Sequence, residues 1–350
     1  MRLFLRWLLR LTAVAVVGVL ALLSPVVYSE TMCRPTGEAD SRKPILDQMH
    51  HRAESRTLLT YPEWHIVHAY EDYARVIETG DPHDYQFLKG ISGFWRSVCT
   101  MSQASGTLGP IEGATKQMVY VIGVSFTAEL LAKAAYEETF GRLFSALRGP
   151  SRAILDDVSA QQAKEYASFL QQVPWYKWDF LADAQALAEE DAKELRDRER
   201  RIALGLEYRT KAAYAKVIDA AVAGVGADAL TLRMIVDGVS PETLERFNGV
   251  TVVGKTRFGI EIETIRYREL THLILEMASI GVEFVEIAGN DDIMFTTISE
   301  SDTQPNAIYS DARQGFESHR HIILTKVANL ASDLRALQDG TQRLEHIHDY

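Results

Sequence analysis

The amino-terminal segment constrains the fold of this chain more than any other part. Residues Leu8–Tyr28 (LLRLTAVAVVGVLALLSPVVY) carry one charge, Arg10, and the 17 residues from Leu11 to Val27 carry none. A helix rises about 1.5 Å per residue, so about 20 apolar residues cross the roughly 30 Å hydrocarbon core of a bilayer. The sequence therefore predicts a transmembrane anchor over residues 1–28.

The charges around this segment favour one orientation. Arg2, Arg6 and Arg10 precede it, which predicts a cytoplasmic amino terminus and export of the body that follows. Basic residues at 34, 42 and 43 weaken the bias. A cleaved signal peptide is the alternative, but the apolar run is longer than the roughly 7–15 residues usual for one.

A second apolar stretch, Met118–Tyr136, contains only Glu129 and Lys133 as charges. Each would cost about 2.5–3.5 kcal/mol at a bilayer centre, so a buried helix in a soluble core is favoured over a second span. Glu129, Lys133 and Glu137 form a charged line with a spacing of four. If this line is buried it must be paired, and its role is then structural or catalytic.

Composition excludes several classes of protein. The chain is 47% hydrophobic and 24% charged, which suits a packed core. Its net charge is −11, and residues 31–350 alone carry −13, so nucleic acid is not an expected partner. Cys33 and Cys99 permit at most one disulfide and exclude a cysteine-built metal site.

The body divides into two parts by its periodicity. Residues 29–57 predict a polar tether without a fold, and residues 58–225 predict a mostly helical domain. Within it, residues 180–222 predict one long helix. Apolar residues recur there every seven positions, at Leu181, Ala188, Leu195 and Ile202, which indicates a coiled-coil or antiparallel packing partner, including a homodimer contact.

After residue 226 the period changes to that of strands. Residues 226–300 predict a small antiparallel α+β domain of ferredoxin-like type, in which 282–288 and 293–298 pair as a hairpin. Residues 301–350 predict a closing helix, Ile322–Leu337, and a charged tail. The expected fold class is α+β with an amino-terminal transmembrane helix.

The densest group of chemically active side chains is Tyr61–Ala74 (YPEWHIVHAYEDYA). On a helix, His65, His68 and Asp72 share one face, nearly opposite the apolar face, and could offer two imidazoles and a carboxylate to a divalent metal. An exposed polar face is the more ordinary interpretation. His346 and His348, close to the chain end, are expected to be exposed and mobile.

A cluster of aromatic residues, Trp175, Tyr176 and Trp178, follows Pro174. Such side chains suit a lipid interface, and they also suit hydrophobic packing at the start of the long helix, which is favoured. The chain has no GxSxG, Ser-x-x-Lys or GxxxxGK[ST] motif, so no catalytic set is recognisable and no cofactor is predicted.

Three stretches carry a resemblance: Tyr61–Ala74, VIGVSFTAELLAKAAYEETFG (Val121–Gly141) and FVEIAGNDDIMFT (Phe284–Thr296). They look like an uncharacterised bacterial family of membrane-anchored proteins. The resemblance implies a membrane-anchored protein and brings no reaction or cofactor. Together with the apolar segment and the basic residues before it, we expect a bacterial single-pass inner-membrane protein with a periplasmic body. The family pattern has aromatics where this chain has His65 and His68, which weighs against a metal there.

These observations predict a membrane-tethered binding or assembly module, which acts on the bilayer and on a protein or lipid-like partner or a second copy of itself. The alternative is a metal- or His-dependent enzyme centred on His65, His68 and Asp72.

Overall fold

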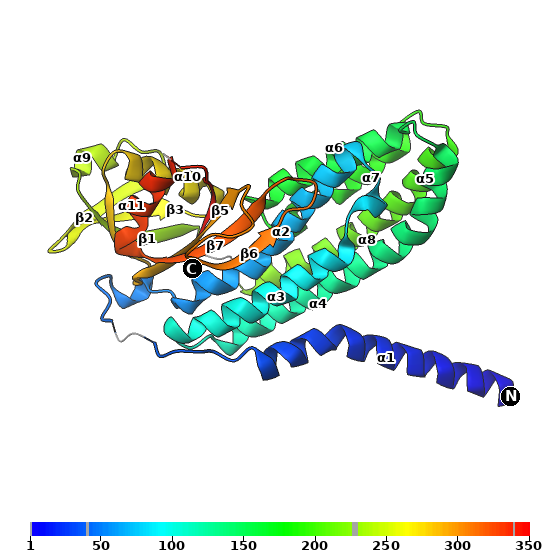
Figure 1. Ribbon diagram of the computed structural model, residues 1–350, viewed down its shortest axis with the longest axis horizontal. Coiled ribbons are helices and arrows are strands. Elements are labelled where there is room, and N and C mark those ends of the chain that lie inside the picture. The colour runs from blue at the N-terminus through cyan, green and yellow to red at the C-terminus, as the bar shows by residue number, and fades with distance from the viewer. Residues whose placement is uncertain (1, 40–41, 226–229, 339) are drawn as a thin grey trace.

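The computed structural model describes residues 2–39, 42–225, 230–338 and 340–350. Helices from residues 55–225 form a long bundle, and two antiparallel sheets from residues 231–348 lie at one end of it (Figure 1). The α+β class is therefore confirmed. The domain boundary predicted at residue 226 falls on residues 226–229, outside the described part of the chain.

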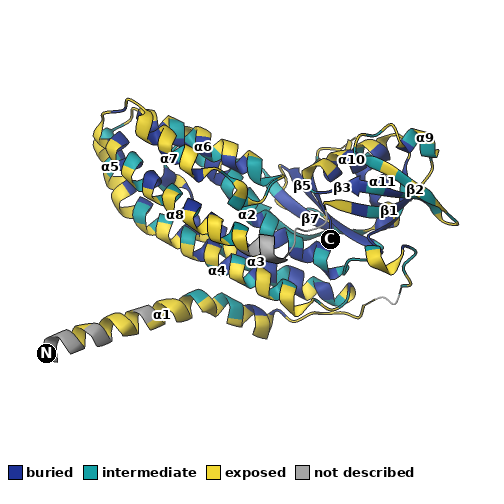
Figure 2. Ribbon diagram, turned by 180° about the vertical axis from the view of Figure 1, so that it is seen from behind, coloured by how far each residue is buried: buried dark blue, intermediate teal, exposed yellow. Residues whose placement is uncertain are grey.

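Helix α1 (Arg2–Met32) contains the first of two segments that are long and apolar enough to cross a membrane, Arg10–Met32. None of its apolar window is buried, and Figure 2 shows most of its described residues exposed. It touches the body near its carboxyl end, where the Glu30 carboxylate accepts from the Tyr120 hydroxyl at 2.7 Å and from Lys116 Nζ at 3.1 Å.

The bundle is built from seven further α-helices: α2 (Ser55–Thr79), α3 (Phe87–Ala104), α4 (Gly113–Tyr136), α5 (Arg142–Arg148), α6 (Ile154–Leu170), α7 (Phe180–Glu189) and α8 (Leu195–Val225). A π-helical turn, Glu137–Gly141, continues α4 into α5. Short 3-10 turns span Gln48–His50, Pro82–Asp84, Ser105–Thr107 and Trp175–Lys177.

Helix α4 belongs to the second candidate span, Gly113–Arg148, of whose apolar window 28% is buried. The inner face of α4 packs into the bundle core through Phe126 and Leu130, while its outer face is exposed. The buried core helix predicted for residues 118–136 is thus correct for one face only.

The single long helix predicted over 180–222 is wrong, because the chain leaves the helical path between Glu189 and Leu195 and folds back as an α7–α8 hairpin. Arg201 stabilises this turn by donating to the carbonyls of Leu187, Glu190 and Ala192. The predicted stripe does not form a seam within the chain, since its members Leu181, Leu195 and Ile202 are all exposed.

The first sheet comprises β1 (Thr231–Asp237), β2 (Val250–Thr256), β3 (Gly259–Ile265) and β4 (Glu283–Ile287), in the antiparallel order β2-β3-β1-β4. Helix α9 (Pro241–Leu244) follows β1, and α10 (Arg268–Ser279) follows β3. In β3, Ile260 and Ile262 are buried while Glu261 and Glu263 on the other face pair with Arg233, as the alternating sequence requires.

The second sheet comprises β5 (Asp292–Ser299), β6 (Ala307–Ala312), β7 (His319–Lys326) and β8 (Arg343–His348), in the antiparallel order β6-β7-β5-β8. Helix α11 (Val327–Gln338) links β7 to β8. The helix and charged tail predicted for residues 301–350 are therefore wrong in part. Helix α11 is shorter than predicted, and the strands β6, β7 and β8 occupy much of the remaining segment.

The hairpin predicted across residues 282–298 is also wrong. A tight turn occurs at Ala288 and Gly289, which have φ of 50° and 82°, but β4 and β5 on its two sides belong to different sheets. The reason is that β5 is buried on both faces, so it needs a strand on each side and lies between β7 and β8.

One hydrophobic core joins the two sheets. Helices α10 and α11 each contact strands of both, and the core contains Met234, Ile274, Phe284, Phe295 and Leu330. The other face of β5 contributes Met294 to a core shared with α2 and α3. The bundle and the sheets therefore meet through α2 and the second sheet.

The segment predicted as an unfolded tether packs in part against the first sheet. The Glu286 carboxylate on β4 accepts from the backbone N–H groups of Ile45 and Leu46, each at 2.8 Å, and from Arg42 at 2.7 Å. Leu46 is buried. Closer to the anchor, a disulfide joins Cys33 to Cys99 on α3 and fixes the end of α1 to the bundle.

We expect the Cys33→Ser substitution to lower the free energy of unfolding by about 2–4 kcal/mol, because the unfolded chain is then no longer cross-linked between residues 66 apart. Thermal unfolding of the full-length protein in detergent, with and without reductant, measures this. Cys99→Ser should give the same loss, and reductant should change neither variant. A reductant effect on either variant would contradict the pairing.

Candidate functional site

The residues predicted as a metal or polar site lie on α2 and are buried: His65, His68 and Asp72 are 6%, 3% and 7% exposed. The expectation of an outward polar face is wrong. The second sheet covers that face, so α2 is packed on two opposite sides.

His65 is a core histidine that contacts α3 and α4, although it lines the same small cavity as His68 and Asp72. Its Nε2 lies 3.0 Å from the Gly90 carbonyl oxygen, and its ring packs edge-on against Phe94 and Phe126. Burial lowers its pKa to about 3, so the ring is neutral.

His68 and Asp72 belong to a polar group between α2 and the second sheet, which we call the α2–sheet cluster: His68, Glu71, Asp72, Arg313, Arg320 and Glu345. Arg320 of β7 donates to the Glu345 carboxylate of β8 at 2.5 and 2.7 Å, across the intervening strand β5. Arg313 donates to Glu71 Oε1 at 3.0 Å, and Asp72 Oδ2 accepts from the Gln314 N–H at 2.8 Å.

Protonation in the cluster follows from burial and pairing. Burial alone would raise the pKa of Glu345, but Arg320 outweighs it and lowers that pKa to about 2. Burial raises the pKa of Asp72 to about 7 against the opposing pull of Arg320. Burial and Arg320 both lower the pKa of His68, so its imidazole is neutral.

Of the three predicted residues, only His68 belongs to a group with metal-ligand spacing. One ligand atom from each of His68, Glu71 and Glu345 lies within 4.8 Å of the others. Neither His65 nor Asp72 is in this group.

The histidines at the chain end are buried beside the cluster, so their predicted exposure is wrong. His346 and His348 are 3% and 0% exposed because β8 is the edge strand covered by α2. The Trp64 ring lies 3.5 Å from that of His346, and the Thr271 hydroxyl lies 3.1 Å from His346 Nδ1.

A second polar group, which we call the α4–α8 ladder, lies inside the bundle and contains the predicted charge line. Three pairs join the antiparallel helices α4 and α8 and the π turn: Glu129–Lys211 at 2.7 Å, Lys133–Glu207 at 3.1 Å and Glu137–Arg200 at 2.9 Å. Arg200 also binds Glu199, which accepts from the Tyr136 hydroxyl. All three predicted charges are therefore paired.

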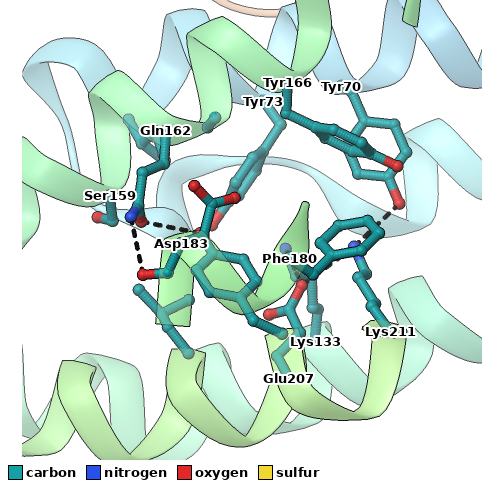
Figure 3. Close-up of a pocket in the computed structure, with 14 residues that line it drawn as sticks. Tyr70, Tyr73, Lys133, Ser159, Gln162, Tyr166, Phe180, Asp183, Glu207 and Lys211 are labelled. Carbon is teal, nitrogen blue, oxygen red and sulfur yellow. Dashed lines mark hydrogen bonds and ion pairs between the residues drawn. The ribbon is translucent and has the colours of Figure 1, made fainter. Parts of the chain in front are cut away.

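A cavity of about 30 Å³ adjoins this ladder. In Figure 3, Tyr70, Tyr166 and Phe180 surround Lys211, whose ammonium lies 5.1–5.7 Å from their ring centres. Burial alone would raise the pKa of Glu207, but Lys133 and Lys211 lower it to about 2. Glu207 is therefore ionised at neutral pH.

The predicted aromatic cluster packs within the bundle. Trp178 contacts Tyr166 and Phe169 and donates from its indole nitrogen to Asp183 Oδ2 at 2.6 Å. Trp175 packs on Tyr214, and Tyr176 lies against Trp175.

Neither polar group opens onto a substrate-sized space. The cavity beside the α2–sheet cluster, lined by His65, His68, Asp72 and Arg320 among others, measures about 20 Å³. A cavity of this size holds about one water molecule, and the 30 Å³ cavity holds little more. The sites suit an ion, a proton or a water.

Sequence analysis did not identify Arg313, Arg320 and Glu345 as site residues. The only signal is that Arg320 and Glu345 interrupt segments that otherwise alternate as strands, and their pairing depends on sheet order. Comparison with known proteins adds nothing, since no family model, curated protein or solved structure matches this chain.

We expect Arg200→Met to lower the free energy of unfolding by about 3–5 kcal/mol, because it leaves the buried Glu137 carboxylate without its guanidinium and removes one of the two guanidiniums that bind Glu199. Denaturant unfolding of the full-length protein measures the loss. Arg198→Met, at an exposed position two residues away, is the control and should change stability by less than about 0.5 kcal/mol. Equal effects of the two variants would show that the ladder is not formed.

Proposed function

We propose that this protein is a membrane-tethered binding module, and that its helical half binds the surface of the bilayer in which α1 is anchored. The observation that carries the proposal is an exposed apolar face beside the anchor. We call it the outer face: Met118, Val121, Leu131, Phe140, Leu143 and Leu147 of α4–α5, and Ile202, Leu206 and Val217 of α8, all at least 40% exposed.

The outer face is free of charge along α4. Between Lys116 and Glu138 the only charged residues are the three of the ladder, which turn inward to α8. The ladder residues mark the sides on which α4 and α8 face each other. Counted from them at about 100° per residue, Leu206 and Val217 of α8 lie on the same outer side of the pair as Val121 and Ala132 of α4. Exposed apolar surface of this extent marks an interaction site.

The position of the anchor favours lipid as the partner. In Figure 1 the bundle and α1 lie side by side near the carboxyl end of α1 and diverge toward its amino terminus. The disulfide and the Glu30 contacts hold the carboxyl end of α1 to the bundle, and Pro25 within α1 provides a point of bending. A bend at this point would bring a bilayer that contains α1 against the bundle.

Charge is complementary to lipid as well. The outer face on α8 is bordered by the exposed cations Arg198, Arg209 and Lys216, although residues 31–350 carry a net charge of −13. Cations beside an apolar helix face suit anionic head groups. Insertion of α4 as a second span is disfavoured, because it would require breaking the three pairs of the ladder in hydrocarbon.

We infer that the body lies on the periplasmic side of a bacterial inner membrane, with the amino terminus in the cytoplasm. Arg2, Arg6 and Arg10 before the span support this orientation. The Cys33–Cys99 disulfide supports an oxidising compartment for the body.

We also infer that β1–β4 with α9 and α10 form a ferredoxin-like unit. The element order β-α-β-β-α-β and the strand order β2-β3-β1-β4 support it. The order β6-β7-β5-β8 repeats the same pattern and supports a second unit that lacks the first helix.

A metal- or His-dependent enzyme is the second candidate function. It is favoured by one observation, the buried imidazole of His68, whose two ring nitrogens have no hydrogen-bond partner among the described residues.

The bilayer proposal predicts that a fluorescent label at Ile202→Cys or Leu143→Cys is quenched by spin-labelled lipid when the full-length protein is in vesicles with anionic lipid. Lys164→Cys on α6, also exposed, is the control within the bundle and should stay unquenched, because it lies outside the outer face. The native cysteines are paired and do not react.

Photo-crosslinking from Ile202 distinguishes the other partners. An adduct of two copies of this chain, or an adduct with one defined protein, together with unquenched labels, would replace lipid as the occupant of the outer face. Equal quenching at Lys164 and Ile202 would also overturn the proposal.

A further inference from the structure

The feature that calls for an explanation is the imidazole of His68. It is 3% exposed, and neither Nδ1 nor Nε2 has a hydrogen-bond partner among the described residues. A buried polar group without a partner costs about 1–3 kcal/mol, and native proteins contain few of them. Both ring nitrogens of His348 also have no partner among the described residues, so the feature that points to a ligand at His68 is that two carboxylates lie beside its ring.

Two carboxylates bracket this ring at a distance that is too long for hydrogen bonds. His68 Nδ1 lies 3.8 Å from Glu71 Oε2, and Nε2 lies 3.7 Å from Glu345 Oε2. Metal bonds to nitrogen and oxygen of about 2.0–2.2 Å place neighbouring ligand atoms roughly 3–4 Å apart. These two distances go to different ring nitrogens, of which one ion can bind only one. The observation that fits a shared ion is that one ligand atom from each of His68, Glu71 and Glu345 lies within 4.8 Å of the other two.

We propose that His68, Glu71 and Glu345 bind one divalent transition-metal ion between α2 and the second sheet. One imidazole and two carboxylates are ligands for zinc, manganese or iron(II). The site is independent of the outer face, which lies on α4, α5 and α8.

The two arginines of the cluster position the ligands and leave room for the ion. A carboxylate has about four lone-pair directions, of which Arg320 occupies two on Glu345 and Arg313 occupies one on Glu71. The adjoining 20 Å³ cavity has room for a water that completes the coordination.

The route to the site passes Glu71, whose side chain is 31% exposed while those of His68 and Glu345 are 4% and 11% exposed. An ion can therefore reach the cluster from solvent by way of one mobile carboxylate. The same exposure makes Glu71→Gln the variant that changes a ligand with the least effect on folding.

The test uses the full-length protein, purified in detergent through a tag without histidine and exposed separately to zinc, manganese and cobalt(II) before dialysis. Elemental analysis should find about one ion per chain for at least one metal, with a rise in the midpoint of thermal unfolding. In His68→Gln and in Glu71→Gln the affinity for the ion should fall by roughly tenfold or more, and the metal content and the rise in the unfolding midpoint should fall with it. Circular dichroism verifies that each variant is folded.

His83→Gln is the matched control, because His83 is a half-buried histidine next to Asp84 on a different face of the bundle. It should bind metal as the native protein does. Native protein that binds no ion after exposure would overturn the proposal, and so would folded His68→Gln and Glu71→Gln variants that retain the same metal content.

Discussion

The burial of α2 on two opposite sides is the constraint on which the rest of the structure depends. One side of the helix enters the bundle core through Tyr73 and Ile77, and the other lies under β7 and β8. A helix enclosed in this way can keep polar side chains only where partners meet them, since unpaired buried groups cost more than hydrogen bonds contribute. The strands that cover α2 therefore supply Arg320 and Glu345 opposite Glu71 and Asp72.

The charged groups of the α4–α8 ladder are also buried and must also have partners, but the consequence here concerns the orientation of α4. Buried ion pairs often add little net stability, because desolvation offsets their attraction. The ladder nevertheless fixes which face of α4 points inward, since Glu129, Lys133 and Glu137 must all meet α8. An outer face without charge follows from this requirement, so the interior pairing determines what the surface of the bundle can bind.

The sequence was sufficient to predict structure where a local pattern of residues decides it, and insufficient where segments far apart in the chain pack together. Helix α1, a candidate membrane span, follows from an uncharged run, and β3 follows from the alternation of Phe258–Ile265. The period of α2 predicted its helix but not its second buried side, because the covering strands lie more than 240 residues away. For β5, Ile293, Met294 and Phe295 are apolar in succession, which is the pattern of a central strand and not of a hairpin arm. His68 was identified from its neighbours in sequence, whereas its partners Arg320 and Glu345 depend on sheet order.

Helix α2 also relates the two proposed sites to each other. His68 and Glu71 face the second sheet, while Tyr70, between them in sequence, faces the bundle and donates from its hydroxyl to Glu129 of the ladder at 2.6 Å. An ion bound by His68, Glu71 and Glu345 would join α2 to β8 by a strong contact, in addition to the packing already present. Because Tyr70 and Glu129 join the same helix to α4, that ion would also fix the sheets relative to the outer face. The two sheets would then be held at a set orientation above the bilayer, which is what a module that presents a surface to a partner requires.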